Sequence, residues 1–232
     1  MLAAYALAMP GPNVDPPPVR AATWVVVVAG GSGTRFGGAK QYLEVAGRRV
    51  LDWAVAAARV VADGVVVVVP EHDTIAPVPA VESIVAGGPT RAESVRRGLA
   101  AIPDDADVIL VHDAARPAAS PALFERVAEA VRAGADGVVP VVPVTDSLRH
   151  RNGAAVDRET LVVVQTPQGF SAPRLRAAHA TAADASDDAT LVEAAGGTIV
   201  TVDGEPTNLK LTHPHEVATL SAILRDRPQE LT

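Results

Sequence analysis

The chain has 232 residues, and its hydrophobic content of 48% is enough for the core of one α/β domain of generous size. Its net charge of −7 argues against general attraction to nucleic acid or to an anionic membrane, so an anionic ligand needs a local group of cations. Cysteine is absent, which excludes disulfides, thiolate nucleophiles and cysteine-ligated metals and favours a cytoplasmic enzyme.

The first residues differ in composition from the rest of the chain. The stretch from Met9 to Arg20 is rich in proline, which fits neither a helix interior nor a central strand. The sequence therefore predicts a mobile extension over 1–22 and a single domain over 23–228. We expect no signal peptide, because the first residues lack the positively charged region with which signal peptides begin. We expect no membrane partner, because no apolar run approaches the ~20 residues of a membrane-spanning helix.

A buried strand followed by a glycine-rich loop opens the domain. Trp24 to Val28 is an unbroken apolar run, typical of a strand covered on both faces of a parallel sheet. Glycine then recurs between Gly30 and Gly38, and such a loop lets backbone N–H groups converge on an anion. Arg35 and Lys40 add positive charge, which favours a phosphate-binding loop over a glycine-rich surface turn.

Two better-known glycine fingerprints do not fit this loop. A dinucleotide-binding G-x-G-x-x-G that starts at Gly31 needs glycine where Phe36 stands. A P-loop matches Gly33 and Gly38 but places Ala39 where its lysine belongs. A dinucleotide oxidoreductase stays an alternative that a titration with NAD(H) would detect.

Lysine usage singles out two positions. The chain has 20 basic residues, and only Lys40 and Lys210 among them are lysine, so 20 − 2 = 18 are arginine. In such a chain a lysine indicates a place where a compact ammonium is needed and a broad guanidinium is not. We therefore expect both lysines to be functional.

After the loop, helical and extended segments alternate as in a doubly wound sheet. The predicted helices are 49–61, 91–101 and 121–133, and the predicted strands are 65–69, 83–86, 108–112 and 137–142. Thr90 and Glu93 predict a capping box at the second helix.

Polar residues follow the strand at 108–112. Ligands of doubly wound sheets bind beyond the carboxyl ends of strands, so Asp113 and Arg116 lie where a site is expected. One carboxylate suffices for Mg²⁺ when nucleotide phosphates supply the other ligands, and this makes Asp113 the predicted metal ligand. His112 is expected to be structural, since its side chain points away from that of Asp113.

A predicted hairpin interrupts the alternation over 143–165. Asn152-Gly153 between two extended runs is a strong hairpin signal. An arm of this kind often contacts a second subunit, so we expect a homodimer. Arg158 and the turn Q-T-P-Q-G-F would close the site from this side.

The last part contains a further helix at 172–183, a helix from Ser186 to Gly196, a strand at 198–202 and a final helix that begins near Pro214. His213 and His215 lack a third metal ligand, so helix-entry polarity is the favoured role. Together these elements predict an α/β fold: a Rossmann-like three-layer sandwich with a mostly parallel mixed sheet and a protruding β-hairpin arm.

An ordered set of motifs covers the chain from residue 24 to 212: A-G-G-S-G-T-R, K-Q-Y-L, G-G-P-T-R-A-E-S-V, V-H-D-A-A-R-P, T-D-S, V-D-R, Q-T-P-Q-G-F, S-D-D-A-T and N-L-K-L-T. The set resembles the 2-C-methyl-D-erythritol 4-phosphate cytidylyltransferase family of the non-mevalonate isoprenoid pathway. The resemblance implies transfer of a cytidylyl group from CTP to a polyol phosphate, with Mg²⁺ as the divalent cation and without nucleic acid.

The resemblance also implies roles for single residues. Arg35 and Lys40 would stabilise the transition state at the α-phosphate, and Arg158 and Lys210 would position the acceptor. The acceptor pocket would be lined, partly across the dimer, by Asp113, Arg116, Ser147, Thr166 and Ser186. CTP would contact the loop and two later segments, through Ala29, Gly30, Gly31, Ser32, Gly33, Gly88, Ser94 and Ala114.

Two departures from the family pattern bear on the acceptor. Val28 to Gly31 reads V-A-G-G where the family usually has P-A-A-G, and Ala39 stands where it usually has proline. The A-G-G form resembles the sister ribitol-5-phosphate cytidylyltransferases, which keeps ribitol 5-phosphate as an alternative acceptor, whereas H-D-A-A-R-P favours methylerythritol phosphate. A non-catalytic nucleotide-binding module is the remaining alternative, and it would keep the loop but lose the cations.

Overall fold

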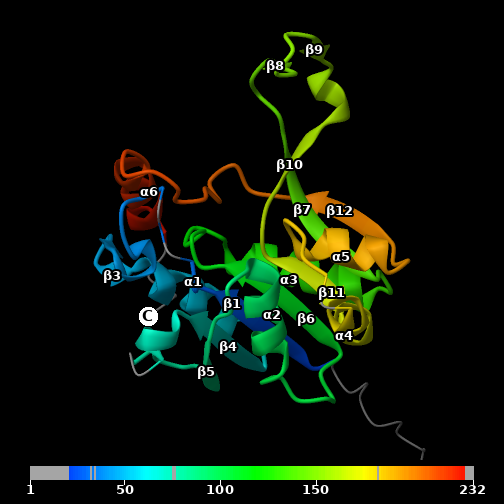
Figure 1. Ribbon diagram of the computed structural model, residues 1–232. Helices are drawn as coiled ribbons and strands as arrows, with labels where there is room; N and C mark the ends of the chain where they lie inside the picture. The colour runs from blue at the N-terminus through cyan, green and yellow to red at the C-terminus, as the bar shows by residue number, and fades with distance from the viewer. Residues whose placement is uncertain (1–20, 32, 34, 75–76, 182, 228–232) are drawn as a thin grey trace, which may run out of the picture.

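The structure is a computed structural model that describes residues 21–31, 33, 35–74, 77–181 and 183–227. One eight-stranded sheet has the strand order β10-β7-β11-β6-β1-β4-β5, with β12 paired to β7 (Figure 1). Its strands are β1 (Thr23–Val28), β4 (Gly64–Val69), β5 (Ser83–Ala86), β6 (Val108–Asp113), β7 (Gly137–Pro143), β10 (Val162–Val164), β11 (Gln168–Ser171) and β12 (Ile199–Asp203). Only β10 and β11 run antiparallel to their neighbours in it, so the mixed, mostly parallel sheet that the sequence predicts is confirmed.

Unbroken runs of valine form the buried centre of this sheet. Val25 to Val27 in β1 and Val65 to Val69 in β4 have no exposed surface. Alternate residues pack on opposite faces, Val25 and Val27 in one hydrophobic cluster and Val26 in another. Burial on both faces is what a β-branched run without polar alternation predicts.

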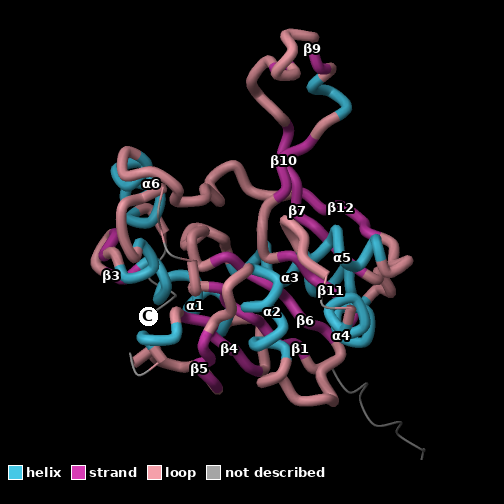
Figure 2. Tube along the Cα trace, viewed as in Figure 1, coloured by secondary structure: helices cyan, strands magenta, loops and turns pink. Residues whose placement is uncertain are grey.

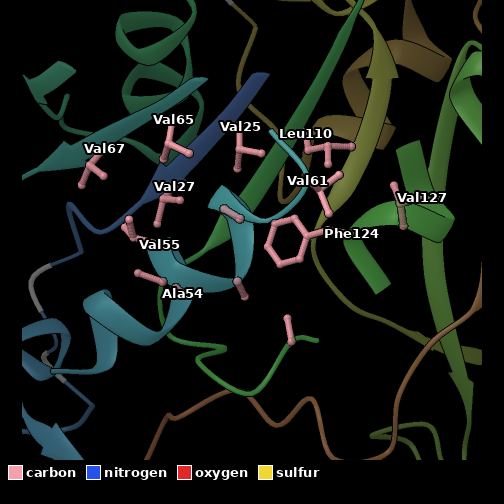
Figure 3. Packing of buried hydrophobic residues seen from close by; sticks show 14 of the residues in the cluster. Val25, Val27, Ala54, Val55, Val61, Val65, Val67, Leu110, Phe124 and Val127 are labelled. Carbon is pink, nitrogen blue, oxygen red and sulfur yellow. The ribbon is translucent and has the colours of Figure 1, made fainter. Parts of the chain in front are cut away.

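Helices cover both faces of the sheet and make three layers. On one face α1 and α3 bring Val55 and Phe124 against Val25 and Leu110 (Figure 3). On the other face α2, α4 and α5 contribute to the cluster that contains Val26. The bounds are α1 (Val50–Arg59), α2 (Arg91–Leu99), α3 (Pro121–Arg132), α4 (Ala172–Ala180) and α5 (Asp188–Ala194). The predicted three-layer sandwich is confirmed.

The last helix, α6 (Glu216–Arg225), packs Leu220 and Leu224 against Trp53 and Val45 in a third cluster. The remaining short elements are the hairpin of β2 (Glu44–Val45) and β3 (Arg48–Arg49) and the 3-10 helices Lys40–Tyr42, Glu71–Asp73 and Arg158–Thr160. Within the part of the chain that the structure describes, no helix combines the length and the apolarity that a bilayer crossing needs.

The predicted arm projects from the body of the domain (Figures 1 and 2). Its stem is the antiparallel pair of β7 and β10, and its tip holds the short hairpin of β8 (Leu148–Arg149) and β9 (Ala155–Val156). Gly153 has a φ of 93°, and the His150 N–H donates to the Ala154 carbonyl at 2.8 Å, so the Asn-Gly signal does mark the turn. Three valines of the stem, Val162 to Val164, are exposed.

Two predictions of local structure were wrong, and a third was half confirmed. The residues Q-T-P-Q-G-F include the strand β11, which lies between β6 and β7 and fully buries Phe170. The helix expected from Ser186 starts at Asp188, because the Asp187 carboxylate accepts the Thr190 N–H at 2.9 Å and caps it. The predicted capping box is half formed: the Thr90 hydroxyl accepts the Glu93 N–H at 3.1 Å, but the Glu93 carboxylate accepts from Arg96 and Arg97.

Domain bounds were predicted as 1–22 and 23–228. Residues 1–20 and 228 lie outside the described residues. The described part from Thr23 onward forms one body around the sheet, and we keep the extension and the single domain as predictions.

Candidate functional site

A cavity of about 410 Å³ opens at the carboxyl ends of β1 and β6. The chain leaves β1 toward β4 on one side, while β6 lies on the other side of β1, so this is the point where the strand order reverses. The cavity is lined by residues 28–31, 40–41, 88–91, 94, 113–115 and 210. It therefore occupies the place where doubly wound sheets bind their ligands.

Most of the residues that the sequence singled out line this cavity. They are Ala29, Gly30, Gly31, Lys40, Gly88, Ser94, Asp113, Ala114 and Lys210. Lys40 and Lys210 are far apart in sequence, and the fold brings both to one place. The sequence therefore predicted the glycine-loop, lysine and aspartate parts of the site.

The glycine loop depends on the conformation of Gly33. Its φ is +64°, and its carbonyl accepts the N–H groups of Phe36 and Gly37, both at 2.9 Å. A Cβ at this position would lie 1.8 Å from the Gly38 carbonyl oxygen, so only glycine fits. Gly33 thus closes the loop between the β1 end and Lys40. The predicted contact Ser32 lies outside the described residues.

Lys40 is half-buried at the edge of the cavity. Its Nζ donates to the carbonyl of Leu211 at 2.6 Å, which ties the loop to the segment after β12. Burial lowers the pKa of Lys40, and the positive charges of Lys210 and Arg35 lower it further. Three cations therefore share one electrostatic environment, as an anionic ligand requires. Arg35 itself is exposed and does not line the cavity.

Ser94 shapes the opposite wall. Its hydroxyl accepts the Gly88 N–H at 3.0 Å and bonds with the Thr90 carbonyl at 3.0 Å. A Cβ on Gly30 would lie 3.6 Å from the same oxygen, so the two glycine segments approach each other here. Ser94 lines the cavity, but its hydroxyl holds the segment around Gly88 in place. Its predicted contact with CTP stays a prediction.

Asp113 ends β6 between two cations. Its Oδ1 lies 3.4 Å from the Arg91 Nε, and its Oδ2 lies 2.6 Å from the Lys210 Nζ. Burial raises the pKa of Asp113, but the charges of Arg91 and Lys210 outweigh that effect and hold the pKa well below its usual range. Asp113 is therefore an anion at neutral pH.

Sequence reasoning missed the group behind Asp113. The Arg91 Nη1 lies 2.7 Å from the Asp188 Oδ2, and the Asp188 Oδ1 lies 2.9 Å from the His179 Nε2. Asp188 has no exposed surface. Burial lowers the pKa of Arg91, and the charges of Asp188 and Asp113 more than reverse that effect, so the net shift is upward. The S-D-D-A-T motif marked a helix start but carried no signal for this pairing.

Gln41 was missed as well. It lines the cavity, is 4% exposed, and its Nε2 has no hydrogen-bond partner among the described residues. Its place in K-Q-Y-L, directly after Lys40, was the available signal. A buried donor without a hydrogen-bond partner destabilises the protein. The Gln41 amide therefore suits a cavity wall at which a bound polar ligand accepts that hydrogen bond.

A buried network beneath the cavity fixes Asp113. The Asp113 N–H donates to the Thr166 hydroxyl at 3.0 Å, and that hydroxyl lies 3.2 Å from the His112 Nδ1. The His112 Nε2 faces the Arg116 carbonyl at 3.2 Å, so Nε2 carries the proton and Nδ1 accepts from Thr166. Burial lowers the pKa of His112 to about 4. His112 is structural, as predicted, and Thr166 positions Asp113 from outside the cavity.

Arg116 also lies outside the cavity lining. Its Nη1 donates to the Asn208 carbonyl at 2.8 Å, and its Nη2 donates to the Val164 carbonyl at 3.3 Å. Burial lowers the pKa of Arg116. In the single chain this side chain ties β6 to the foot of the arm and to the segment before Lys210.

The structure does not bring the other predicted acceptor residues to the cavity of the same chain. Arg158 and Ser147 are exposed on the arm, where the Arg158 Nη1 donates to the Thr145 carbonyl at 2.6 Å (Figure 1). Ser186 is exposed in the loop before α5. Their roles stay predictions.

The cavity offers few ligands for a metal ion. Among the described residues no three His, Cys, Asp or Glu side chains gather as a metal site, and the stacked rings of His213 and His215 gain no third ligand. Asp113 offers a single ionised carboxylate at the cavity, and one carboxylate fits Mg²⁺ when phosphates complete the shell. Both of its oxygens already face cations, so the phosphates would supply most of the ligands.

A doubly wound sheet with a glycine loop and convergent cations at its switch point defines an α/β protein of the nucleotidyltransferase class. The comparison with protein families makes this specific. The family model described as "IspD: 2-C-methyl-D-erythritol 4-phosphate cytidylyltransferase" matches residues 23–226. The chain belongs to this family.

Individual relatives agree with the assignment. The chain is 42% identical over 215 residues to the 2-C-methyl-D-erythritol 4-phosphate cytidylyltransferase of Rhodococcus jostii, a match that covers 87% of this chain and 94% of that protein. The crystal structure of the same-named enzyme from Thermus thermophilus superposes with a TM-score of 0.76 at 38% identity, covering 86% of this chain and 98% of that one.

The chain is also 42% identical over 227 residues to the "Bifunctional enzyme IspD/IspF" of Solidesulfovibrio magneticus. That match covers 85% of this chain but 56% of the relative. The chain thus spans a little over half the length of this relative.

Proposed function

We propose that the chain transfers the cytidylyl group of CTP to 2-C-methyl-D-erythritol 4-phosphate in non-mevalonate isoprenoid biosynthesis. The products are 4-diphosphocytidyl-2-C-methyl-D-erythritol and pyrophosphate. The observation that carries the proposal is the convergence of Lys40 and Lys210, the only two lysines of the chain, on one cavity beside the glycine loop. Membership of the family supplies the substrate class.

The reaction needs no general base from the protein. An acceptor phosphate oxygen, already anionic at neutral pH, attacks the α-phosphorus of CTP. The bond from that phosphorus to the bridging oxygen breaks, and its electron pair leaves with pyrophosphate. Two polyanions must meet in line, so the barrier is mainly electrostatic, and fixed cations supply the stabilisation.

The positions of the cations indicate which phosphate each of them would stabilise. Lys40, held by the Leu211 carbonyl at the end of the glycine loop, would face the α-phosphate, with Arg35 beside it. Lys210, paired with Asp113, would hold the acceptor phosphate. The glycine loop from Gly30 to Gly33 and the segment around Gly88 would enclose the nucleotide.

Mg²⁺ is the divalent cation that we propose. When bound it would neutralise phosphate charge, which lets the acceptor approach. The triphosphate would supply most of the ligands, with Asp113 as the protein ligand.

We propose a homodimer that completes the acceptor pocket. Arg158 and Ser147 lie on an arm that leaves its own domain, and the stem exposes Val162 to Val164, so a second copy would receive the arm.

Mixing two variant chains tests whether the arm acts across the dimer. A Lys40→Ala chain and an Arg158→Ala chain are each impaired alone. If the arms act across the dimer, one of the two sites in each mixed dimer is intact, and random mixing restores roughly a quarter of wild-type activity. No gain on mixing would show that the arm serves its own chain or none.

The function is tested by pyrophosphate release. The wild-type protein is assayed with CTP, ATP or GTP, each with methylerythritol phosphate or ribitol 5-phosphate. We expect release only with CTP, and a higher kcat/KM for methylerythritol phosphate. Preference for ribitol 5-phosphate would assign the sister activity, and absence of release with both acceptors would reject the proposal in favour of a non-catalytic nucleotide-binding module.

A further inference from the structure

A series of polar contacts runs from a buried histidine to the acceptor lysine. The groups, in order, are His179 of α4, Asp188 of α5, Arg91 of α2, Asp113 of β6 and Lys210 of the segment after β12. The successive N···O distances are 2.9, 2.7, 3.4 and 2.6 Å. Three of these groups, His179, Asp188 and Arg91, are not among the site residues that the sequence predicted.

The buried end of this series is Asp188. It has no exposed surface, and its two carboxylate oxygens face Arg91 and His179. A buried carboxylate is strongly destabilising unless it is well paired, so its place depends on these two partners. His179, 3% exposed, adds a ring nitrogen at the second oxygen. Asp188 is therefore held in one position.

The distances show which carboxylate places the guanidinium. Arg91 lies 2.7 Å from Asp188 but 3.4 Å from Asp113, so its anchor is Asp188. The Asp113 Oδ2 is therefore available to accept a hydrogen bond from the Lys210 Nζ, at 2.6 Å. Without the charge of Asp188, the fork of Arg91 would be drawn to Asp113 as a two-point pair, in competition with Lys210.

We infer that Asp188, backed by His179, is a positioning residue for the acceptor phosphate. It acts through Arg91: by holding the guanidinium, it keeps Asp113 paired with Lys210 and so keeps the Lys210 ammonium in place. The inference rests on the proposed function, because it assigns Lys210 to the acceptor side of that site.

The test compares Asp188→Asn with wild type, with KM measured separately for CTP and for the acceptor. Asparagine has the same shape, its carbonyl can accept from Arg91, and its amide can donate to the other tautomer of His179, so the fold is kept while the charge is lost. We expect an acceptor KM raised roughly tenfold, with the CTP KM within about twofold.

A double-mutant cycle shows whether the effect passes through Arg91. Asp188→Asn, Arg91→Gln and the double variant are compared. If Asp188 acts through Arg91, the double variant loses no more acceptor kcat/KM than Arg91→Gln alone. Losses that multiply would overturn the inference.

The matched control is Asp187→Ala. Asp187 caps the same helix, accepting the Thr190 N–H at 2.9 Å. Its removal should lower Tm by the loss of a cap and leave the acceptor KM unchanged. An acceptor KM raised equally by both variants would show that only the stability of α5 matters.

Three further outcomes are distinguished. If Asp188→Asn does not fold, Arg91→Lys serves in its place: a compact ammonium lacks the planar fork with which Arg91 reaches both Asp188 and Asp113, so the same rise in acceptor KM is expected, and an equal loss for CTP would overturn the inference. If wild type is active and Asp188→Asn has an unchanged acceptor KM, the inference alone fails. If wild type forms no product, the proposed function fails first.

Discussion

The Lys210 ammonium lies 2.6 Å from the Oδ2 of Asp113, across 97 residues of sequence. The sequence assigned Lys210 to acceptor positioning, and Asp113 both to the acceptor pocket and to metal binding. Their pairing means that a substitution at either one changes the electrostatics of the other. The first two predictions follow from this contact.

Lys210→Ala should raise the acceptor KM by about tenfold or more. The variant removes the charge that, by the proposed function, holds the attacking phosphate, and leaves Asp113 facing that phosphate, which adds repulsion. Some loss of kcat should follow from misorientation, whereas the CTP KM should change little. Steady-state kinetics with each substrate varied in turn measures the split, and an unchanged acceptor KM would remove Lys210 from the acceptor side.

Asp113→Asn should lower activity and raise the Mg²⁺ concentration needed for half-maximal rate. The amide is a poorer ligand for a hard cation than the carboxylate. A magnesium titration of wild type and variant gives the comparison. Full wild-type activity in excess chelator would show that no divalent cation is needed.

Lys40→Ala should lower kcat and kcat/KM together by roughly 10²-fold, with little change in the CTP KM, because its charge acts on the transition state. Lys40→Arg should also be strongly impaired, since a planar guanidinium cannot replace an ammonium that is half-buried and held by the Leu211 carbonyl. The control is Arg59→Lys on α1, whose Arg59 pairs with Glu82 outside the cavity lining. Near wild-type turnover of Lys40→Arg would make the scarcity of lysine an accident of composition.

Gly33→Ala should abolish most activity, because its φ of +64° and the 1.8 Å approach of a Cβ to the Gly38 carbonyl force the loop to rearrange. Gly38→Ala is the matched control in the same loop: its Cβ would meet nothing within 4 Å, so activity should stay within a few-fold of wild type. Pyrophosphate release by both variants gives the answer, and equal activities would contradict the loop geometry.

His112 should make stability depend on pH between about 4 and 6.5. Its pKa is lowered from 6.5 to about 4 in the folded protein, so the unfolded chain binds a proton in this window that the folded chain does not. Stability therefore falls as pH falls, by about 2 kcal/mol at pH 5 relative to neutral pH.

Chemical denaturation at pH 5 and 7.5 measures that difference. His112→Gln cannot titrate and should reduce the dependence, whereas His72→Gln, at a side chain that is 82% exposed, should leave it unchanged. The same dependence in His112→Gln as in wild type would show that another group is responsible.

Local patterns carried the prediction of the fold and of half of the site. The valine runs predicted β1 and β4, and Asn152-Gly153 predicted the turn of the arm. The scarcity of lysine indicated Lys40 and Lys210 as site residues. These signals are visible in sequence because each depends on neighbouring residues or on composition.

The rest depends on residues that are distant in sequence. Arg91 and Asp188 meet only because α2 and α5 cover the same face of the sheet, and neither segment has a pattern that names its partner. The strand β11 lacks a β-branched run and is buried by its neighbours, so a turn was predicted in its place. Arg158 and Ser147 lie on the arm, outside the cavity lining of their own chain.

The most direct test of the central claim is to identify the bond that forms. The wild-type protein is incubated with CTP, Mg²⁺ and 2-C-methyl-D-erythritol 4-phosphate, and ³¹P NMR follows the phosphates. We predict two coupled signals of a new asymmetric diphosphate that grow in step with pyrophosphate, only when the acceptor is present, and at a much lower rate in Lys40→Ala. Formation of CMP and pyrophosphate without the diphosphate, or no change in CTP at all, would contradict the assignment of cytidylyl transfer to this site.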